Sequence, residues 1–180
     1  MPFQPVEIRT ERLLLRPWRL TDVDDAFAYA SDEEWARYLW NTPWPYERRH
    51  AEEFVARAAT NDWSAQAQFA IESEGTVIGG IRLYMIYPPG HSVAGVGYNV
   101  GRVYWNRGYV TEAATAVLKY GFAAGLHKVT ATADARNLAS IRVMEKLGMT
   151  REGVLRQQRF SHGEYVDEVH YGILRSEWQQ

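Results

Sequence analysis

Hydrophobic positions recur along the chain with two different periods, and each change of period marks the boundary of a predicted element. Apolar residues spaced as on one face of a helix predict helices over 22–30, 46–59, 110–121 and 138–147. Apolar and β-branched runs bounded by turn residues predict strands over 12–16, 68–72, 76–83, 92–104, 129–133, 153–160 and 165–174. The order β-α-α-β-β-β-α-β-α-β-β predicts an α/β domain around one mixed sheet.

Composition narrows the class of protein. The 180 residues contain no repeat or Gly/Ser linker, which predicts one domain over 1–180. The 20 Lys and Arg residues against 22 Asp and Glu give a net charge of -2 without a basic cluster, which argues against nucleic acid as a partner. No apolar run reaches the ~20 residues that cross a membrane, and the first residues lack the order of a secretion signal. Together with the absence of cysteine, which excludes thiolate metal sites and cysteine nucleophiles, this predicts a cytoplasmic protein.

The stretch YWNRGYVTEAATAVLKYG, residues 104–121, places Gly108 directly before a predicted helix. The amides at a helix N-terminus are unpaired and carry partial positive charge, so an anion can bind there, and a glycine lets it approach the backbone. Residues 106–111 then supply amides and the Thr111 hydroxyl to a phosphate or pyrophosphate, with Arg107 as a charge partner. The alternative is that Gly108 only makes a turn. The patterns GxxxxGK[ST] and GxGxxG are absent here, which disfavours a nucleotide phosphate.

Four segments in the same order resemble one family. They are TERLLLRPWRLTDVDDAF, VGYNVGRVYWNRGYVTEA, NLASIRVMEKLGM and GEYVDEVHYGIL, and together they cover nearly the whole chain. The chain is similar to the GNAT superfamily of acetyl-coenzyme A dependent N-acetyltransferases, in its ribosomal-protein branch. The resemblance implies a twisted, mostly antiparallel mixed sheet of about seven strands flanked by helices. It also implies acetyl-coenzyme A as cosubstrate, no metal, and an amine acceptor.

The resemblance assigns coenzyme contacts residue by residue. The strand before the glycine loop contacts the pantetheine arm, the loop holds the pyrophosphate, and the start of the later helix adds further contacts. The implied residues are Tyr98, Asn99, Val100, Asn106, Arg107, Gly108, Tyr109, Val110, Thr111, Asn137 and Ser140. Trp105 and Val110 differ from the residues that are usual in this loop. The loop binds pyrophosphate through backbone amides, and these are present whichever side chains stand there.

The resemblance also bears on the catalytic groups. Relatives often carry a tyrosine that protonates the leaving thiolate, at the position of Met144 here, and methionine cannot donate a proton. Ser140 lies one turn earlier on the same helical face and is the predicted replacement. Ser140 and Asn137 are also at positions where they would simply cap the helix.

The base that many relatives use is missing, because Gly95 stands where they place a glutamate. A protein α-amine with a pKa near 8 costs only about 1.4 kcal/mol to neutralise at pH 7, against about 4.6 kcal/mol for lysine, so the chain suits an α-amine. Asp167, His170 and Glu164 are the candidate replacements, and Asp167 is the predicted catalytic carboxylate. Asp167 equally suits a structural hydrogen-bond acceptor.

The acceptor side is predicted from the aromatic segment 35–44 between the first two helices. Trp40, Trp44 and Tyr46 are expected to wall the acceptor, and acids at 33, 34, 52 and 53 to attract a cation. The predicted function is acetyl transfer by direct attack on a protein N-terminal α-amine. Alternatives are a small amine such as a polyamine or aminoglycoside, and a non-catalytic acyl-coenzyme A binding module, which Gly95 and Met144 favour. A homodimer is also allowed.

Overall fold

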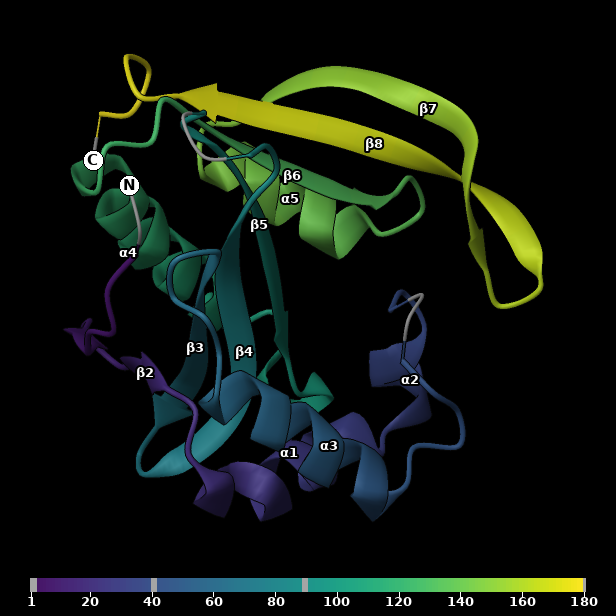
Figure 1. Cartoon of the computed structure of the whole chain (residues 1–180). Helices are drawn as coiled ribbons and strands as arrows, with labels where there is room; N and C mark the ends of the chain where they lie inside the picture. The colour runs from purple at the N-terminus through teal and green to yellow at the C-terminus, as the bar shows by residue number, and fades with distance from the viewer. Residues whose placement is uncertain (1–2, 40–41, 89–90, 180) are drawn as a thin grey trace.

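One twisted sheet organises the chain, as a computed structural model describes it over residues 3–39, 42–88 and 91–179 (Figure 1). The eight strands lie in the order β1-β2-β3-β4-β5-β6-β8-β7, and each neighbouring pair is antiparallel except β5 with β6. The strands are β1 (Ile8–Arg9), β2 (Leu14–Pro17), β3 (Gln66–Ser73), β4 (Thr76–Met85), β5 (Val93–Val100), β6 (Lys128–Asp134), β7 (Thr150–Ser161) and β8 (Glu164–Leu174). The predicted mixed, mostly antiparallel sheet is confirmed. The strand beyond the expected seven is β1, whose two residues are too few to form a pattern.

Five helices flank the sheet. They are α1 (Val23–Ala30), α2 (Glu33–Ala36), α3 (Arg48–Ala59), α4 (Tyr109–Ala123) and α5 (Leu138–Lys146). The short α2 was not predicted and overlaps the start of the aromatic segment 35–44; Asp32 caps it by accepting from the amides of Glu34 and Trp35. The strand expected to reach Tyr104 ends at Val100, because residues 102–104 form a 3-10 turn.

The helices cover the two faces of the sheet separately (Figure 1). Ala113, Val117 and Leu118 of α4 pack with Leu83 and other sheet residues in the larger core. A smaller cluster on the opposite face joins Trp18, Ala26 of α1, and Ala51, Val55 and Ala58 of α3 to Ala70 and Val77 of the sheet. Alternate residues of one strand face opposite sides, so β3 and β4 contribute residues to both clusters. The α4–α5 face and the α1–α3 face are therefore distinct surfaces of the sheet.

The parallel pair β5–β6 is short, and this positions the site. The ladder joins Val93, Ala94 and Gly95 to Lys128, Val129 and Thr130, and beyond these residues the two strands separate. On its other side β5 stays paired with β4 as far as Val100. The β6-facing backbone edge of residues 96–100 thus has no strand partner.

Within the described residues, no helix is long and apolar enough to cross a membrane.

Candidate active site

A cavity of about 550 Å³ opens where β5 and β6 separate, and residues of both sheet faces line it. The Tyr98 side chain of β5 points toward α5. Its neighbours Gly97 and Asn99 face the α1–α3 side of the sheet, and all three residues line the cavity. Residues of α1 and α3 line it from one side, and Asn137 and Ser140 at the start of α5 line it from the other. The cavity therefore connects the two faces through the gap in the sheet.

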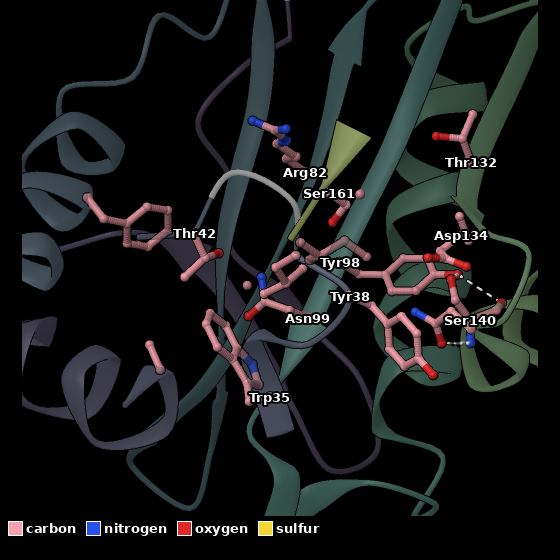
Figure 2. A pocket seen from close by; sticks show the side chains of 18 of the residues that line it. Trp35, Tyr38, Thr42, Arg82, Tyr98, Asn99, Thr132, Asp134, Ser140 and Ser161 are labelled. Carbon is pink, nitrogen blue, oxygen red and sulfur yellow. Dashed lines mark hydrogen bonds between the residues drawn. The ribbon is translucent and has the colours of Figure 1, made fainter. Parts of the chain in front are cut away.

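Two hydroxyl groups meet at the α5 side of this cavity (Figure 2). Tyr98 Oη lies 3.1 Å from Ser140 Oγ and also donates to the Ser140 carbonyl at 3.3 Å. The Ser140 amide donates to Asn137 Oδ1 at 3.1 Å, so Asn137 is the N-cap of α5. Burial raises the pKa of Tyr98 to about 12, against an opposing effect of the Ser140 hydrogen bond. The phenol is therefore protonated at neutral pH and can donate.

Met144 is fully buried in the larger core and does not line the cavity. Met144, the position for which the resemblance implied a proton-donating tyrosine, thus has a packing role in this chain. Sequence reasoning named Tyr98 only as a strand contact. Its pairing with Ser140 joins residues 42 positions apart, and no local pattern reports such a contact.

The glycine loop lies at the N-terminus of α4. Gly108 has φ 79° and is the N-cap, and Asn106 also has a positive φ of 59°. The first helical hydrogen bond runs from the Glu112 amide to the Gly108 carbonyl at 3.0 Å, so the amides of Tyr109, Val110 and Thr111 precede it. A Cβ on Gly108 would lie 3.5 Å from Arg12 Nη2, an ordinary contact. Glycine is therefore required by the backbone conformation, and the exposed amides suit an anion.

Arg12 holds this loop in place. Its guanidinium lies 4.5 Å from the centre of the Tyr109 ring, donates to the Arg107 carbonyl at 3.0 Å and pairs with Glu112 at 2.7 Å. Burial of the Glu112 carboxyl opposes its ionisation, but hydrogen bonds from Thr10 and Arg12 outweigh burial and lower its pKa. The cation thus neutralises Glu112 at the helix start, where an uncompensated carboxylate would repel a phosphate. No sequence pattern signals the role of Arg12, which is almost a hundred residues away.

The predicted coenzyme residues fall into two groups. Tyr98, Asn99, Asn137 and Ser140 line the cavity, whereas Val100 and residues 106–111 do not. Val100 is buried in the core, so only its backbone can serve a ligand. Arg107 is exposed at the loop surface.

Asp167 lies elsewhere. Its carboxylate accepts the Gln157 amide at 2.8 Å, at the irregularity where β7 shifts register against β8 between Leu155 and Arg159. Asp167 borders a separate depression with residues 154–158, whereas its neighbour Val166 lines the main cavity. The predicted catalytic Asp167 therefore does not line the cavity that Ser140 lines. Its observed contact is structural, because it satisfies an amide of the bulged strand.

The predicted acceptor residues also separate. Tyr46 lines the cavity, Trp44 is 46% exposed outside it, and Trp40 lies outside the described residues. Trp35 lines the cavity as well, with its ring centre 6.5 Å from that of Tyr46, although no sequence pattern distinguishes it from its aromatic neighbours. Of the four acids expected to attract a cation, only Glu53 lines the cavity; Glu34 pairs with Arg37 and Glu52 with Arg48 on the surface.

Comparison with known proteins decides the family, because residues 12–150 match the acetyltransferase (GNAT) domain. The chain belongs to the GNAT acetyltransferase family. It is 33% identical over 174 residues to the uncharacterized N-acetyltransferase YnaD of Bacillus subtilis (strain 168), covering 96% of this chain and 99% of that one. The crystal structure of a GNAT acetyltransferase from Bacillus anthracis superposes with a TM-score of 0.84 at 32% identity, covering 96% of this chain and all of that one. The chain is therefore an N-acetyltransferase, and acetyl-coenzyme A is its cosubstrate.

The fold is also that of Mycobacterium smegmatis RimJ in complex with CoA-disulfide. The TM-score is 0.83 at 22% identity, and the match covers 99% of this chain and 92% of RimJ. At this identity the likeness concerns the fold alone.

Tyr84 fills the space beside Gly95, the position for which the family resemblance implied a glutamate base. Gly95 lies directly opposite Tyr84 in the β4–β5 ladder, and a Cβ on Gly95 would lie 2.6 Å from the Tyr84 hydroxyl. The carboxylates that line the described cavity are Glu53 and Asp134. Asp134 pairs with Arg136 at 2.7 Å. Burial opposes ionisation of Asp134, but the Arg136 bonds lower its pKa. No group of three or more potential metal ligands occurs among the described side chains.

Proposed function

We propose that the chain transfers an acetyl group to an α-amine, in the first place the N-terminal amine of a protein, by direct attack within a ternary complex. The observation that carries this proposal is the cavity that joins both faces of the sheet beside the Tyr98–Ser140 pair. The coenzyme is bound on the α4–α5 face, and the acceptor reaches the same opening from the α1–α3 face.

The α4–α5 face offers two kinds of backbone donor to the coenzyme. The amides of Tyr109, Val110 and Thr111 bind the pyrophosphate at the start of α4. The unpaired edge of residues 96–100 hydrogen-bonds the pantetheine arm, as an added strand would. Acetyl-coenzyme A supplies an activated thioester at the end of this arm, beside the gap between β5 and β6.

At the gap, the amine nitrogen forms a bond to the acetyl carbon while the carbon–sulfur bond breaks. The Ser140 hydroxyl donates a hydrogen bond to the sulfur, which departs as a thiolate, and the Tyr98 phenol is hydrogen-bonded to the Ser140 hydroxyl. The amine loses its extra proton to water in the open cavity. An α-amine fits this arrangement, because it needs little help to reach its neutral form at pH 7.

A small amine is the second candidate acceptor. The cavity of about 550 Å³ lies within the range of small-molecule pockets, which is the observation in its favour. The ribosomal-protein branch is proposed from the four motifs alone, and the likeness to RimJ supports the fold on which they lie.

Release of free thiol from acetyl-coenzyme A tests this function. We expect turnover with a tetrapeptide that has a free N-terminus, none with the same peptide N-acetylated, and slower turnover when the only free amine is a lysine side chain. Saturable binding of acetyl-coenzyme A without thiol release from any amine would instead identify a binding module.

A further inference from the structure

Among the described residues, three arginine side chains line the cavity. They are Arg57 of α3, Arg82 of β4 and Arg159 of β7. The cavity carboxylates are Glu53 and Asp134, of which Asp134 is engaged by Arg136. Arg159 forms an ion pair with buried Glu168. In the described parts of the chain Arg57, Arg82 and Glu53 form no ion pair, so the charges left for a ligand are two positive and one negative.

Arg82 lies close to the gap in the sheet. It is directly opposite Gly97 in the β4–β5 ladder, and a Cβ on Gly97 would lie 3.7 Å from Arg82 Nε. Its guanidinium also rests over the Tyr84 ring, 5.0 Å from the centre. The Arg82 side chain therefore lies beside Gly97, one residue away from Tyr98 along β5. Figure 2 shows the Arg82 guanidinium on the side of the cavity away from Ser140.

Two buried polar atoms on the same side have no hydrogen-bond partner among the described residues. They are Asn99 Oδ1, an acceptor, and Trp35 Nε1, a donor, and both residues line the cavity (Figure 2). An unsatisfied buried polar atom costs about 1–3 kcal/mol, so a molecule bound in the cavity that supplied partners to these two atoms would gain affinity from them. A ligand with N–H groups would bind Asn99, and a ligand with anionic oxygens would bind Trp35 and the arginines.

We propose that the acceptor amine carries a carboxylate or phosphate near its nitrogen, which Arg82 and Arg57 bind while Asn99 accepts a hydrogen bond from the amine. This inference rests on the proposed function and narrows its substrate class. It excludes polyamines and aminoglycosides, which would place further cations beside the arginines. The anion can belong to a free amino acid derivative or to an acidic residue near a peptide N-terminus.

Matched acceptors that differ only in charge test the proposal. The peptide pair is Ser-Asp-Ala-Ala-amide against Ser-Asn-Ala-Ala-amide, and the small pair is aspartic acid α-amide against asparagine α-amide. A charge-assisted hydrogen bond contributes about 1.5–3 kcal/mol, so we expect kcat/KM to be about tenfold or more higher for the carboxylate member of at least one pair. The pair that shows the preference identifies the source of the anion. Equal values in both pairs, or faster turnover of spermidine, would overturn the proposal.

Arginine variants locate the effect. Arg82→Gln should reduce the carboxylate preference at least fivefold, and Arg57→Gln should reduce it by a smaller factor. The matched control is Arg9→Gln, because Arg9 is exposed on β1 at the opposite edge of the sheet from β7, and the preference should persist there. A preference that survives in both cavity variants would contradict the assignment.

A binding measurement separates this proposal from the proposed function. If amines are acetylated without preference for the carboxylate, the acceptor class is wrong and the acetyl transfer stands. If no amine causes release of thiol from acetyl-coenzyme A, the proposed function fails. Calorimetry with coenzyme A present then tests the anion site by measuring the affinity for a carboxylate ligand. N-acetylaspartic acid α-amide should then bind about tenfold more tightly than N-acetylasparagine α-amide, and Arg82→Gln should abolish the difference. Equal affinities would overturn the site.

Discussion

The two faces that meet at the cavity differ in how their polar groups are satisfied. On the α4–α5 face, Glu112 is engaged by Thr10 and Arg12, and Ser140 by Asn137 and Tyr98. On the α1–α3 face, Arg57 and Arg82 lack ion pairs within the described residues, and Asn99 Oδ1 and Trp35 Nε1 lack hydrogen bonds there.

This difference separates two ways of building a binding site. The coenzyme face binds through backbone amides that the fold itself orients, and its side chains hold that backbone in place. The acceptor face presents side-chain donors and acceptors whose partners must come from the ligand. The coenzyme face is thus preorganised for one molecule, whereas the acceptor face determines which amine is used.

The largest expected effect breaks the coenzyme face. Gly108→Asp forces φ 79° on a residue with a Cβ and adds a negative charge where the pyrophosphate binds. We expect the affinity for coenzyme A, measured by calorimetry, to fall about 100-fold or more.

Gly163 provides a matched control for this substitution. It has φ 87° in the turn between β7 and β8, and no atom lies within 4 Å of the point that a Cβ would occupy. Gly163→Asp therefore imposes the same backbone strain far from α4 and should leave coenzyme affinity unchanged. Near-normal affinity in Gly108→Asp would remove the loop from the coenzyme site.

A smaller effect is expected at the point where the faces meet. Ser140→Ala should lower kcat about 10- to 100-fold and change the KM for acetyl-coenzyme A little, because the hydroxyl acts on charge that develops only as the sulfur departs. Tyr98→Phe should lower kcat less, and the double variant should resemble Ser140→Ala, since Tyr98 acts through Ser140.

Ser161→Ala is the control for the hydroxyl. Ser161 also lines the cavity but lies on β7, and within the described residues it forms no hydrogen bond with Tyr98 or Ser140. Its kcat should stay within about twofold of the parent value. If Ser140→Ala has full kcat, the hydroxyl pair takes no part in the chemistry.

The contrast between the faces also explains what the sequence could predict. The succession of helices and strands along the chain, the helix start at Gly108 and the N-cap at Asn137 follow from local patterns, because a few neighbouring residues determine them. Position on a strand makes Asp167 a candidate base, but alternation along β8 places Val166 at the cavity and Asp167 outside it, where the bulge of β7 brings the Gln157 amide to its carboxylate.

The acceptor residues escape prediction for a related reason. Arg82, Trp35 and Asn99 come from β4, α2 and β5, and only the packing of α1–α3 on the sheet brings them to one cavity. The four acids near the first helices suggest a cationic acceptor, because the ion pairs of Glu34 with Arg37 and of Glu52 with Arg48 are invisible in the sequence. Arg12 escapes prediction in the same way, since its contact with Glu112 crosses a hundred residues.

The smallest expected effect concerns Glu112. It measures how much the interactions of this carboxylate with Thr10 and Arg12 stabilise the coenzyme face before a ligand binds. The pKa of Glu112 is lowered in the folded state, so its ionised form stabilises the fold above the ordinary carboxyl pKa near 4.3, and that contribution is lost as pH falls through the lowered folded value. Glu112→Gln should reduce the free energy of unfolding in urea by about 1 kcal/mol at pH 7, a low figure because Arg12 is partly exposed to solvent. The difference in the free energy of unfolding between the variant and the parent should be smaller at pH 3.

Glu34→Gln is the control. It removes a surface ion pair with Arg37 and should lower the free energy of unfolding by no more than about 0.5 kcal/mol at either pH. An equal difference in the free energy of unfolding between Glu112→Gln and the parent at pH 7 and pH 3 would show that packing, and not the ionised carboxylate, holds the loop against the segment of Thr10 and Arg12 between β1 and β2.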